Sequence, residues 1–504
     1  MPSVDRADDG RVPVAVLRPL RLDAPTPGSM AHRAALGTVG VAVQGLVRFF
    51  TSLLVGRIAG PRILGIVQPA ISTALLLSLL WPTTTGSAAS KFVARARGAG
   101  DHAEIEAVAA HLRRRTVQAA VLLAAISIPV WIGIDHGHLT DALCVAALLL
   151  GYSGYSFTRG LQFGAGQIPR ATFWDVSSAA LGITALIVSL LLGVRGIALL
   201  LPLAGSYALY TLAGWPWGAR GRLTPVLRRE IDGFVAIGVA GTLASTGFLQ
   251  LSVIIGKLVD TPAHVGQYSA ALALATPASL LAGSLSLTLF PSMAEAWGRG
   301  DRAGFRRQTD LATRALVLVM VTALGGIAVG SRFVVAVLWG GRYDQAADLL
   351  PVLLLAVLGT TIGVASVNSL STRSQRGMVT ASAASVAGLA VGAVVWAVLA
   401  RDHGVMGIAI GYLAGTVVVG GVPLLVVWRI DRQPWAALVG RLLVGVGVAA
   451  ALVVVERASG LSPWLEPVVV VGFVAFWLAL GHRDLRAALT LARPARRVDV
   501  PPPG

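Results

Sequence analysis

Apolar stretches of membrane-spanning length alternate with short polar segments along most of the chain. An α-helix rises about 1.5 Å per residue, so about 20 consecutive apolar residues cross a hydrocarbon core of about 30 Å. On this measure the pattern predicts an all-α polytopic membrane protein with about fourteen transmembrane helices. The predicted spans centre near Val47, Ala74, Ala124, Leu149, Thr184, Ala204, Ala244, Leu280, Ala323, Ala356, Ala390, Thr416, Gly447 and Phe473.

Basic residues gather in every second connection between these spans. The connection after span two carries Arg at residues 113–115, and the one after span eight carries Arg299, Arg302 and Arg306. By contrast, residues 135–141 after span three contain no Arg or Lys. Short cytoplasmic loops are the ones enriched in Arg and Lys. The alternation therefore predicts that both termini face the cytoplasm.

Composition supports membrane residence and excludes several other classes of protein. Only 13% of the residues are charged and 55% are hydrophobic, with a mean hydropathy of +0.75, whereas soluble proteins carry about 25% charged residues. The net charge of +17 does not indicate a nucleic-acid partner, because the basic residues lie at span ends, where they suit anionic lipid headgroups. The single cysteine, Cys144, excludes an intrachain disulfide. We expect no metal site and no cofactor.

An internal repeat relates the two halves of the chain. VGRIAGPRILG from Val55 corresponds to IGKLVDTPAHVG from Ile255, and both copies continue through an apolar stretch to a Gly-Asp pair, at Gly100 and Gly300. An even number of predicted spans separates the copies, so both halves insert with the same orientation. Parallel repeats of this kind form two lobes around a central cavity and work by alternating access.

The repeat and the span pattern together predict the domain organisation. Each lobe holds six spans, and two additional spans follow the second lobe. The predicted segments are a disordered cytoplasmic tail at 1–31, an N-lobe at 32–217, a cytoplasmic linker at 218–230, a C-lobe at 231–430, the additional spans at 431–482 and a cytoplasmic tail at 483–504.

Several motifs in this frame resemble those of the oligosaccharide flippases in the multidrug, oligosaccharidyl-lipid and polysaccharide exporter superfamily. The resemblance covers residues 35–429 and is specific through the order of the motifs rather than through any one of them. The motifs are GRIAGPRILG from Gly56, GQYSAALAL from Gly266, LFPSMAEAWGRGD from Leu289, LWGGRYDQAADLLPVL from Leu338 and GVMGIAIGYLAG from Gly404.

The resemblance implies a V-shaped bundle in the bacterial cytoplasmic membrane that flips a polyprenyl-pyrophosphate-linked oligosaccharide outward. It implies neither a cofactor nor covalent chemistry, and it suggests functional coupling to a polysaccharide polymerase or to glycosyltransferases. Because fold alone does not determine substrate, a cation-coupled multidrug antiporter is the alternative. A membrane-embedded polymerase or glycosyltransferase is a third reading, but no nucleophile constellation or phosphate-binding glycine loop stands out in the sequence.

Ionisable residues inside the spans are the candidates for the transport pathway, because a charge at the bilayer centre is costly. Arg48 lies in the middle of span one, with Gln44 and Ser52 on the same helical face. An arginine fork suits a pyrophosphate, although Arg48 could instead serve helix packing or reach the interface. Arg159 in span four and Asp175 in span five are further candidates. Asp175 could neutralise Arg48 or Arg159, or respond to a coupling ion.

Three further residues complete the set of candidates. Gln250 in span seven is a candidate for contact with the sugar, although polar residues in membranes most often mediate helix packing. Arg57 and Lys257 occupy matching places in the two repeat copies. Either could contact an anionic headgroup of the substrate, or anchor to phosphates of ordinary membrane lipids.

Overall fold

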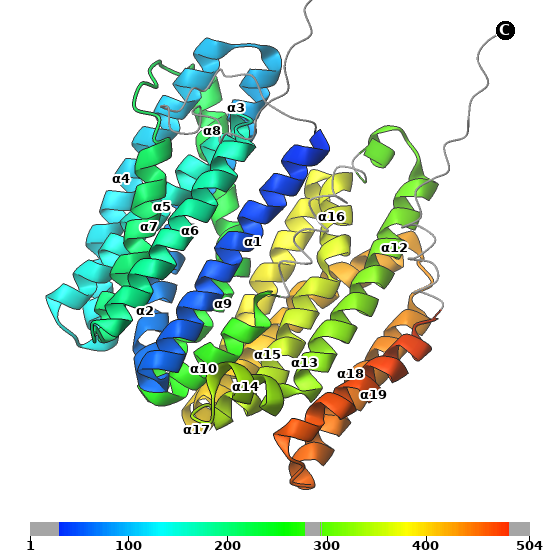
Figure 1. Cartoon of the computed structure of the whole chain (residues 1–504). Helices are drawn as coiled ribbons and strands as arrows, with labels where there is room; N and C mark the ends of the chain where they lie inside the picture. The colour runs from blue at the N-terminus through cyan, green and yellow to red at the C-terminus, as the bar shows by residue number, and fades with distance from the viewer. Residues whose placement is uncertain (1–29, 278–292, 294, 483–504) are drawn as a thin grey trace, which may run out of the picture. The chain divides into compact units, whose positions relative to one another are not determined.

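The computed structural model describes residues 30–277, 293 and 295–482. Within these ranges every regular element is a helix, which confirms the predicted fold class. The predicted span near Leu280, most of the 1–31 tail and the whole 483–504 tail lie outside the described residues. Two compact units divide the chain, and Figure 1 labels their helices.

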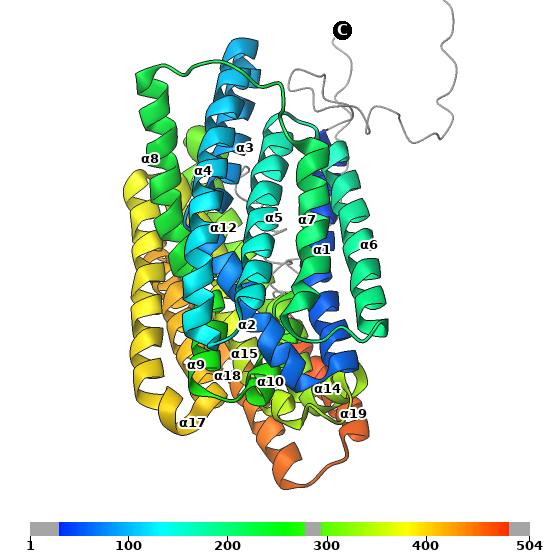
Figure 2. The same ribbon diagram turned by 90° about the vertical axis from the view of Figure 1, so that its left-hand side faces the viewer.

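The first unit, called unit 1 here, takes in the described residues up to Thr51 together with Pro69–Leu243. Within it α5 packs against α3, α4 and α7, and Figure 2 shows α5 running beside α4 and α7. The helices that contribute to unit 1 are α1 (Met30–Leu54), α2 (Pro61–Leu79), α3 (Pro82–Ala99), α4 (His102–Asp135), α5 (Leu139–Gly164), α6 (Ile168–Leu191), η3 (Gly196–Leu200), α7 (Leu201–Gly214) and α8 (Pro225–Thr242).

The second unit, unit 2, takes in Ser52–Gln68 and the described residues from Ala244 onward. It includes the C-terminal end of α1 and the start of α2, which are joined by the π-helix η2 (Val55–Ala59). Its other helices are η4 (Leu243–Gly247, a π-helix that starts at the unit boundary), α9 (Phe248–Val259), α10 (Pro262–Ala275), α12 (Arg302–Met320), η5 (Val321–Gly325), α13 (Gly326–Val329), α14 (Ser331–Trp339), α15 (Asp344–Ile362), α16 (Val364–Arg373), α17 (Gln375–Asp431), α18 (Ala436–Ala458), η6 (Pro463–Leu465) and α19 (Glu466–Leu480).

Twelve helical segments among the described residues are long and apolar enough to cross a membrane. The longest, α17, holds two of the predicted spans, because the backbone leaves the helical region at Gly404 (φ 52°, ψ −133°). The Asp260 carboxylate accepts a hydrogen bond from the Val405 amide (3.0 Å) and so caps the second half of α17. The protein is therefore a multi-pass membrane protein, and the described residues account for all the predicted spans except the one near Leu280.

The two copies of the repeat form the same local structure at their Gly-Asp pairs. Gly100 (φ 72°) and Gly300 (φ 77°) both adopt the left-handed conformation that glycine tolerates best. Asp101 then accepts a 2.8 Å hydrogen bond from the Glu104 amide at the start of α4. Asp301 accepts a 2.8 Å hydrogen bond from the Gly304 amide at the start of α12. The shared sequence thus encodes a helix end followed directly by a helix N-cap.

The repeat also creates a reciprocal contact inside unit 2, where α2 and α10 meet at their first turns. A Cβ atom added to Gly65 would overlap the carbonyl oxygen of Pro262, and one added to Gly266 would overlap that of Pro61. Lipid tails are as apolar as the helices, so the hydrophobic effect does not drive helices together in a membrane. Close van der Waals contact of this kind stabilises the helix pair instead. Only glycine permits this crossing on both helices.

Small residues give the same kind of contact inside unit 1. Gly160 and Gly164 form a Gly-xxx-Gly pair on α5. A Cβ on Gly164 would lie 2.7 Å from the carbonyl oxygen of Ala89 on α3, and the backbone of Gly86 lies directly against Gly160. This pair explains how α3 and α5 come close enough to position the side chains of α5.

The compact units divide the chain differently from the predicted lobes at two places, the turn of the α1–α2 hairpin and α8. Residues 52–68 belong to unit 2, where Arg57 donates to the carbonyls of Val337 (2.9 Å) and Leu338 (3.0 Å) and the Tyr343 hydroxyl donates to that of Gly56 (2.9 Å). Burial raises the pKa of the Tyr343 hydroxyl, so it stays a donor.

Helix α8 belongs to unit 1 rather than to the half that follows the linker. Its Asp232 carboxylate contacts His111 Nε2 (2.9 Å) and Arg115 Nη2 (2.9 Å), both on α4. The helix begins at Pro225, so its first turns occupy part of the predicted 218–230 linker.

We expect Asp101→Ala and Asp301→Ala each to lower the free energy of unfolding by about 1 kcal/mol, because each removes an N-cap. The measurement is the melting temperature of the purified protein in detergent. Asp101→Asn and Asp301→Asn are the matched controls and should change it little, since Asn caps as well as Asp. Equal melting temperatures for the Ala and Asn variants would contradict the capping role.

Gly266→Ala should lower the free energy of unfolding by about 1–3 kcal/mol, because the added methyl overlaps backbone atoms of α2. Gly447→Ala on α18 is the control, since nothing lies within 4 Å of its added Cβ. We expect the control to match or exceed the wild-type melting temperature. A tolerated Gly266→Ala would show that the α2–α10 crossing is looser than described.

Candidate functional site

A buried carboxylate lies at the centre of a polar network on α1, α5 and α6 of unit 1. Asp175 on α6 is fully buried (0% exposed). Its Oδ2 pairs with Arg159 Nε at 3.0 Å, and its Oδ1 accepts a hydrogen bond from the Tyr155 hydroxyl at 3.1 Å. Gln44 on α1 donates to the backbone carbonyl of Asp175 at 3.3 Å. Three predicted site residues, Gln44, Arg159 and Asp175, therefore lie together.

This pairing decides between the partners considered for Asp175. Its carboxylate is neutralised by Arg159, not by Arg48. Gly40 on α1 leaves room for the pair, since a Cβ there would lie only 2.6 Å from Asp175 Oδ2. A charge in the hydrocarbon region is costly unless it is paired and hydrogen-bonded inside the protein. The pair therefore contributes no net charge to its surroundings.

Arg48 has a different environment. Its Nη2 donates to the Tyr152 hydroxyl at 3.0 Å, and its guanidinium carbon lies 5.2 Å from the centre of the Tyr152 ring. Within the described part of the chain it makes no ion pair with a carboxylate. Helix α1 is continuous through Gln44, Arg48 and Ser52, as the predicted shared face requires. Arg48 is therefore a half-buried positive charge whose described neighbours are neutral.

Four of the chain's seven tyrosines form a cluster beside Arg48 and Asp175, which the sequence analysis did not identify. Tyr152 and Tyr155 come from α5, and Tyr207 and Tyr210 come from α7. The ring centroids of Tyr152 and Tyr207 are 5.3 Å apart, those of Tyr155 and Tyr207 are 4.9 Å apart and those of Tyr155 and Tyr210 are 4.8 Å apart. Two tyrosine pairs with i, i+3 spacing on neighbouring spans were the available signal.

The network retains unused hydrogen-bond donors. The Tyr210 hydroxyl donates to Gln162 Oε1 at 2.6 Å, but Gln162 Nε2 is buried without a partner among the described residues. Arg159 Nη2 is likewise buried and unpaired. Together with Arg48, these donors make this region of unit 1 suited to a ligand rich in acceptor oxygens.

The remaining predicted site residues belong to unit 2. Ser52 donates to Gln68 Oε1 at 3.3 Å, and Gln250 on α9 is 7% exposed. Arg57 is exposed and donates to the carbonyls of Val337 and Leu338, while Lys257 is half-buried on α9. Their roles in transport stay predictions.

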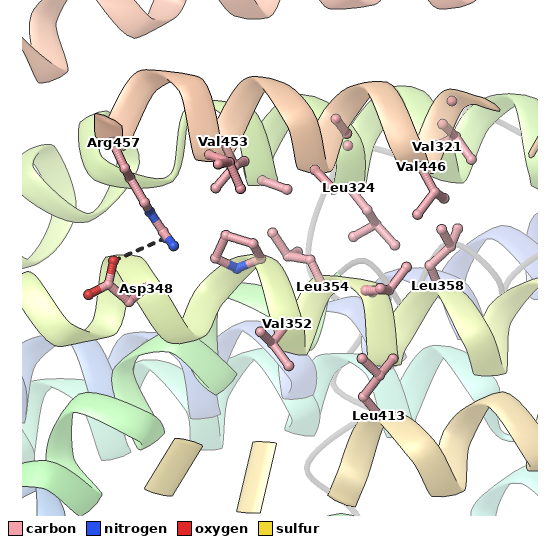
Figure 3. Close-up of a pocket in the computed structure, with 18 residues that line it drawn as sticks. Val321, Leu324, Asp348, Val352, Leu354, Leu358, Leu413, Val446, Val453 and Arg457 are labelled. Atoms are coloured by element: carbon pink, nitrogen blue, oxygen red, sulfur yellow. Dashed lines mark ion pairs between the residues drawn. The ribbon is translucent and has the colours of Figure 1, made fainter. Parts of the chain in front are cut away.

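Unit 2 also contains an apolar cavity of about 250 Å³ between η5, α15 and α18 (Figure 3). An ion pair between Arg457 and Asp348, 3.1 Å long, lies at one end of the cavity. None of the predicted site residues lines this cavity. Among the described residues, no group of three or more His, Cys, Asp and Glu side chains could hold a metal ion.

No protein-family model and no curated protein sequence matches the chain. Solved structures do. The lipid II flippase MurJ in an inward closed conformation matches with a TM-score of 0.68 at 11% identity, covering 90% of this chain and 100% of the other. An inward-facing MATE multidrug resistance transporter of the MOP superfamily matches with a TM-score of 0.63 at 16% identity, covering 79% and 98%. The chain has the fold that these two transporters share.

A transporter from a eukaryote has a similar structure. The eukaryotic MATE transporter AtDTX14 gives a TM-score of 0.57 at 16% identity, covering 82% of this chain and 98% of that one. The matches confirm the fold that the resemblance implied. At these identities the matches establish the fold alone, and a flippase and multidrug transporters both have it.

Asp175→Ala should lower the free energy of unfolding by about 3 kcal/mol, because it leaves the Arg159 charge without its carboxylate. The double variant Arg159→Met with Asp175→Leu should recover much of this loss, since neither charge is then buried. Melting temperatures in detergent measure both effects. If Asp175→Ala melts with the wild type, the ion pair does not stabilise unit 1.

Proposed function

We propose that this protein is a flippase that moves a polyprenyl-pyrophosphate-linked oligosaccharide from the inner to the outer leaflet of a bacterial cytoplasmic membrane by alternating access. Such a step serves the synthesis of cell-envelope polysaccharide or peptidoglycan. The observation that carries the proposal is the environment of Arg48. It is a positive charge within a membrane span, bonded to a neutral tyrosine and to no described carboxylate.

The charge balance of the polar network favours an anionic substrate. Asp175 and Arg159 cancel each other, so Arg48 adds one uncompensated positive charge. A pyrophosphate offers acceptor oxygens with the geometry that a guanidinium fork binds in a bidentate manner. The unpaired nitrogens of Arg159 and Gln162 supply further donors.

The tyrosine cluster suits the sugar portion of such a substrate. Each tyrosine presents an apolar ring face and a polar hydroxyl. Such side chains suit a ligand that itself has apolar faces and hydroxyl groups. Tyr152 contacts Arg48 directly. A headgroup phosphate at Arg48 would thus place its attached saccharide beside the cluster.

Similarity to a lipid II flippase supports a lipid-linked substrate. Under this proposal Ser52 and Gln250 contribute polar contacts, and Arg57 and Lys257 contact anionic headgroups of substrate or membrane lipids. The predicted orientation, with both termini in the cytoplasm, is part of the same proposal. Functional coupling to a polymerase or to glycosyltransferases would supply and consume the substrate.

A cation-coupled multidrug antiporter is the second candidate, because MATE transporters share the fold. An exporter of cations needs a carboxylate that is free to attract its substrate. Asp175 is the buried acid of the network, and it is already bonded to Arg159 and Tyr155. The charge balance therefore favours the flippase.

Arg48→Ala should slow the flipping of a fluorescent polyprenyl-pyrophosphate-saccharide in proteoliposomes by about 10- to 100-fold, because a charged hydrogen bond contributes about 1.5–3 kcal/mol. Arg48→Lys should also be impaired, since a point charge cannot reproduce the fork. Arg195→Ala is the matched control. Arg195 lies in the same unit and, among the described residues, bonds only the carbonyls of Leu190 and Val194, so its loss should leave the rate unchanged.

The same proteoliposomes should be tested for efflux of a cationic dye. Full-rate lipid flipping by a correctly inserted Arg48→Ala variant would remove Arg48 from the substrate site. Dye efflux without any lipid flipping by the wild type would assign the chain to the antiporter alternative.

A further inference from the structure

Two buried glutamates and one arginine lie where α18 is followed by α19 in unit 2. Glu456 lies in the last turn of α18 and is 5% exposed, while Glu466 begins α19 and is 1% exposed. Arg332 reaches this junction from α14. These residues lie outside both the polar network of unit 1 and the predicted substrate pathway.

Glu466 is fully bonded. Its Oε1 accepts from Arg332 Nε at 2.7 Å, and its Oε2 accepts from the Phe333 amide at 2.9 Å. Arg332 Nη2 donates to the backbone carbonyls of Glu456 (3.2 Å) and Leu461 (2.8 Å). Arg332 therefore ties α14 to Glu466 and to the α18–α19 turn.

Glu456 has no comparable support. Its Oε1 is buried and has no hydrogen-bond partner among the described residues. The neighbouring cation, Arg457, points away toward α15, where its Nη2 bonds Asp348 Oδ1 at 3.1 Å and the Ala347 carbonyl at 3.2 Å (Figure 3). Neither nearby arginine donates to the Glu456 carboxyl group.

The charges around Glu456 do not balance if every acid is ionised. Arg332 on α14 and Arg457 on α18 supply two positive charges, whereas Glu456, Glu466 on α19 and Asp348 on α15 supply three negative ones. A buried anion with no donor costs several kcal/mol, and such a group takes up a proton instead. A proton needs a single oxygen, whereas a metal ion needs several oxygen ligands.

We propose that Glu456 is a proton-binding site that keeps the α18–α19 hairpin seated on α14. With the proton bound, Arg332 serves Glu466 alone. When the proton is lost, two adjacent carboxylates compete for Arg332, and the hairpin loosens. The predicted orientation places this end of α18 outside the cell, so the proton exchanges with the external solution. The site is independent of the proposed substrate.

A carbodiimide labels protonated carboxyl groups in apolar surroundings, so it reads the site directly. The full chain in lipid nanodiscs is treated with dicyclohexylcarbodiimide at pH 6.5, and its peptides are analysed by mass spectrometry. We expect an adduct on Glu456, none on Glu466, and a loss of labelling at high pH. A correctly folded wild type that carries no adduct on Glu456 would overturn the proposal. Protection by Na⁺ at constant pH would also overturn it, since a metal cation would then occupy the site.

Thermal stability gives a second readout that does not depend on chemical labelling. The folded protein holds a proton that the unfolded chain releases above about pH 5, so stability falls as pH rises. We expect the wild-type melting temperature to fall by about 3 °C or more between pH 6 and pH 9. Glu456→Gln, which mimics the protonated acid, should remove this dependence, and Glu106→Gln at an exposed position on α4 should keep it. Identical pH profiles for wild type and Glu456→Gln would refute the site. If Glu456→Gln does not fold, the labelling of the wild type decides.

Discussion

The need to compensate every charge inside the hydrocarbon region governs the chemistry of this molecule. Asp175 is tolerated at full burial because Arg159 and Tyr155 bond both of its oxygens. That compensation turns the most conspicuous acid of the spans into a neutral element and leaves Arg48 as the residual charge. The same constraint acts at the junction of α18 and α19, where Glu466 is compensated by Arg332 and Glu456 is not. In each region the proposed function depends on an ionisable group that has no oppositely charged partner among the described residues, Arg48 in unit 1 and Glu456 in unit 2.

An ion pair between two helices forms only if the helices lie close together. Glycine allows this, because it has no side chain to hold the two backbones apart. Lipid tails are as apolar as the helices, so packing depends on close contact rather than on hydrophobic burial. Gly160 and Gly164 bring α5 against α3, on the helix that also carries Tyr152, Tyr155 and Arg159. Gly65 and Gly266 do the same for α2 and α10. Within unit 1, the polar network and the glycine contacts of α5 are thus two parts of one packing arrangement.

Much of this structure could be predicted from the sequence, because hydrophobic length and the placement of arginine report directly on membrane spans. The repeat, the Gly-Asp caps and the candidate charges Arg48, Arg159 and Asp175 were all readable. The choice between Arg48 and Arg159 as the partner of Asp175 was not, since it depends on how α5 and α6 rotate against each other. The tyrosine cluster and the attachment of residues 52–68 to unit 2 were missed for the same reason. Contacts between helices that are far apart in the sequence leave little trace in local spacing.

The division of the chain at Thr51, Gln68 and Leu243 also bears on how such a protein can be assembled. A cut in the connection between α7 and α8 would yield two fragments that match the ancestral repeats. The first fragment would carry residues 52–68, which belong to the fold of unit 2, and the second would carry α8, which belongs to the fold of unit 1. Each fragment would hold a piece that the other needs, as in a domain-swapped dimer. Two such fragments would therefore have to exchange these pieces to rebuild both units.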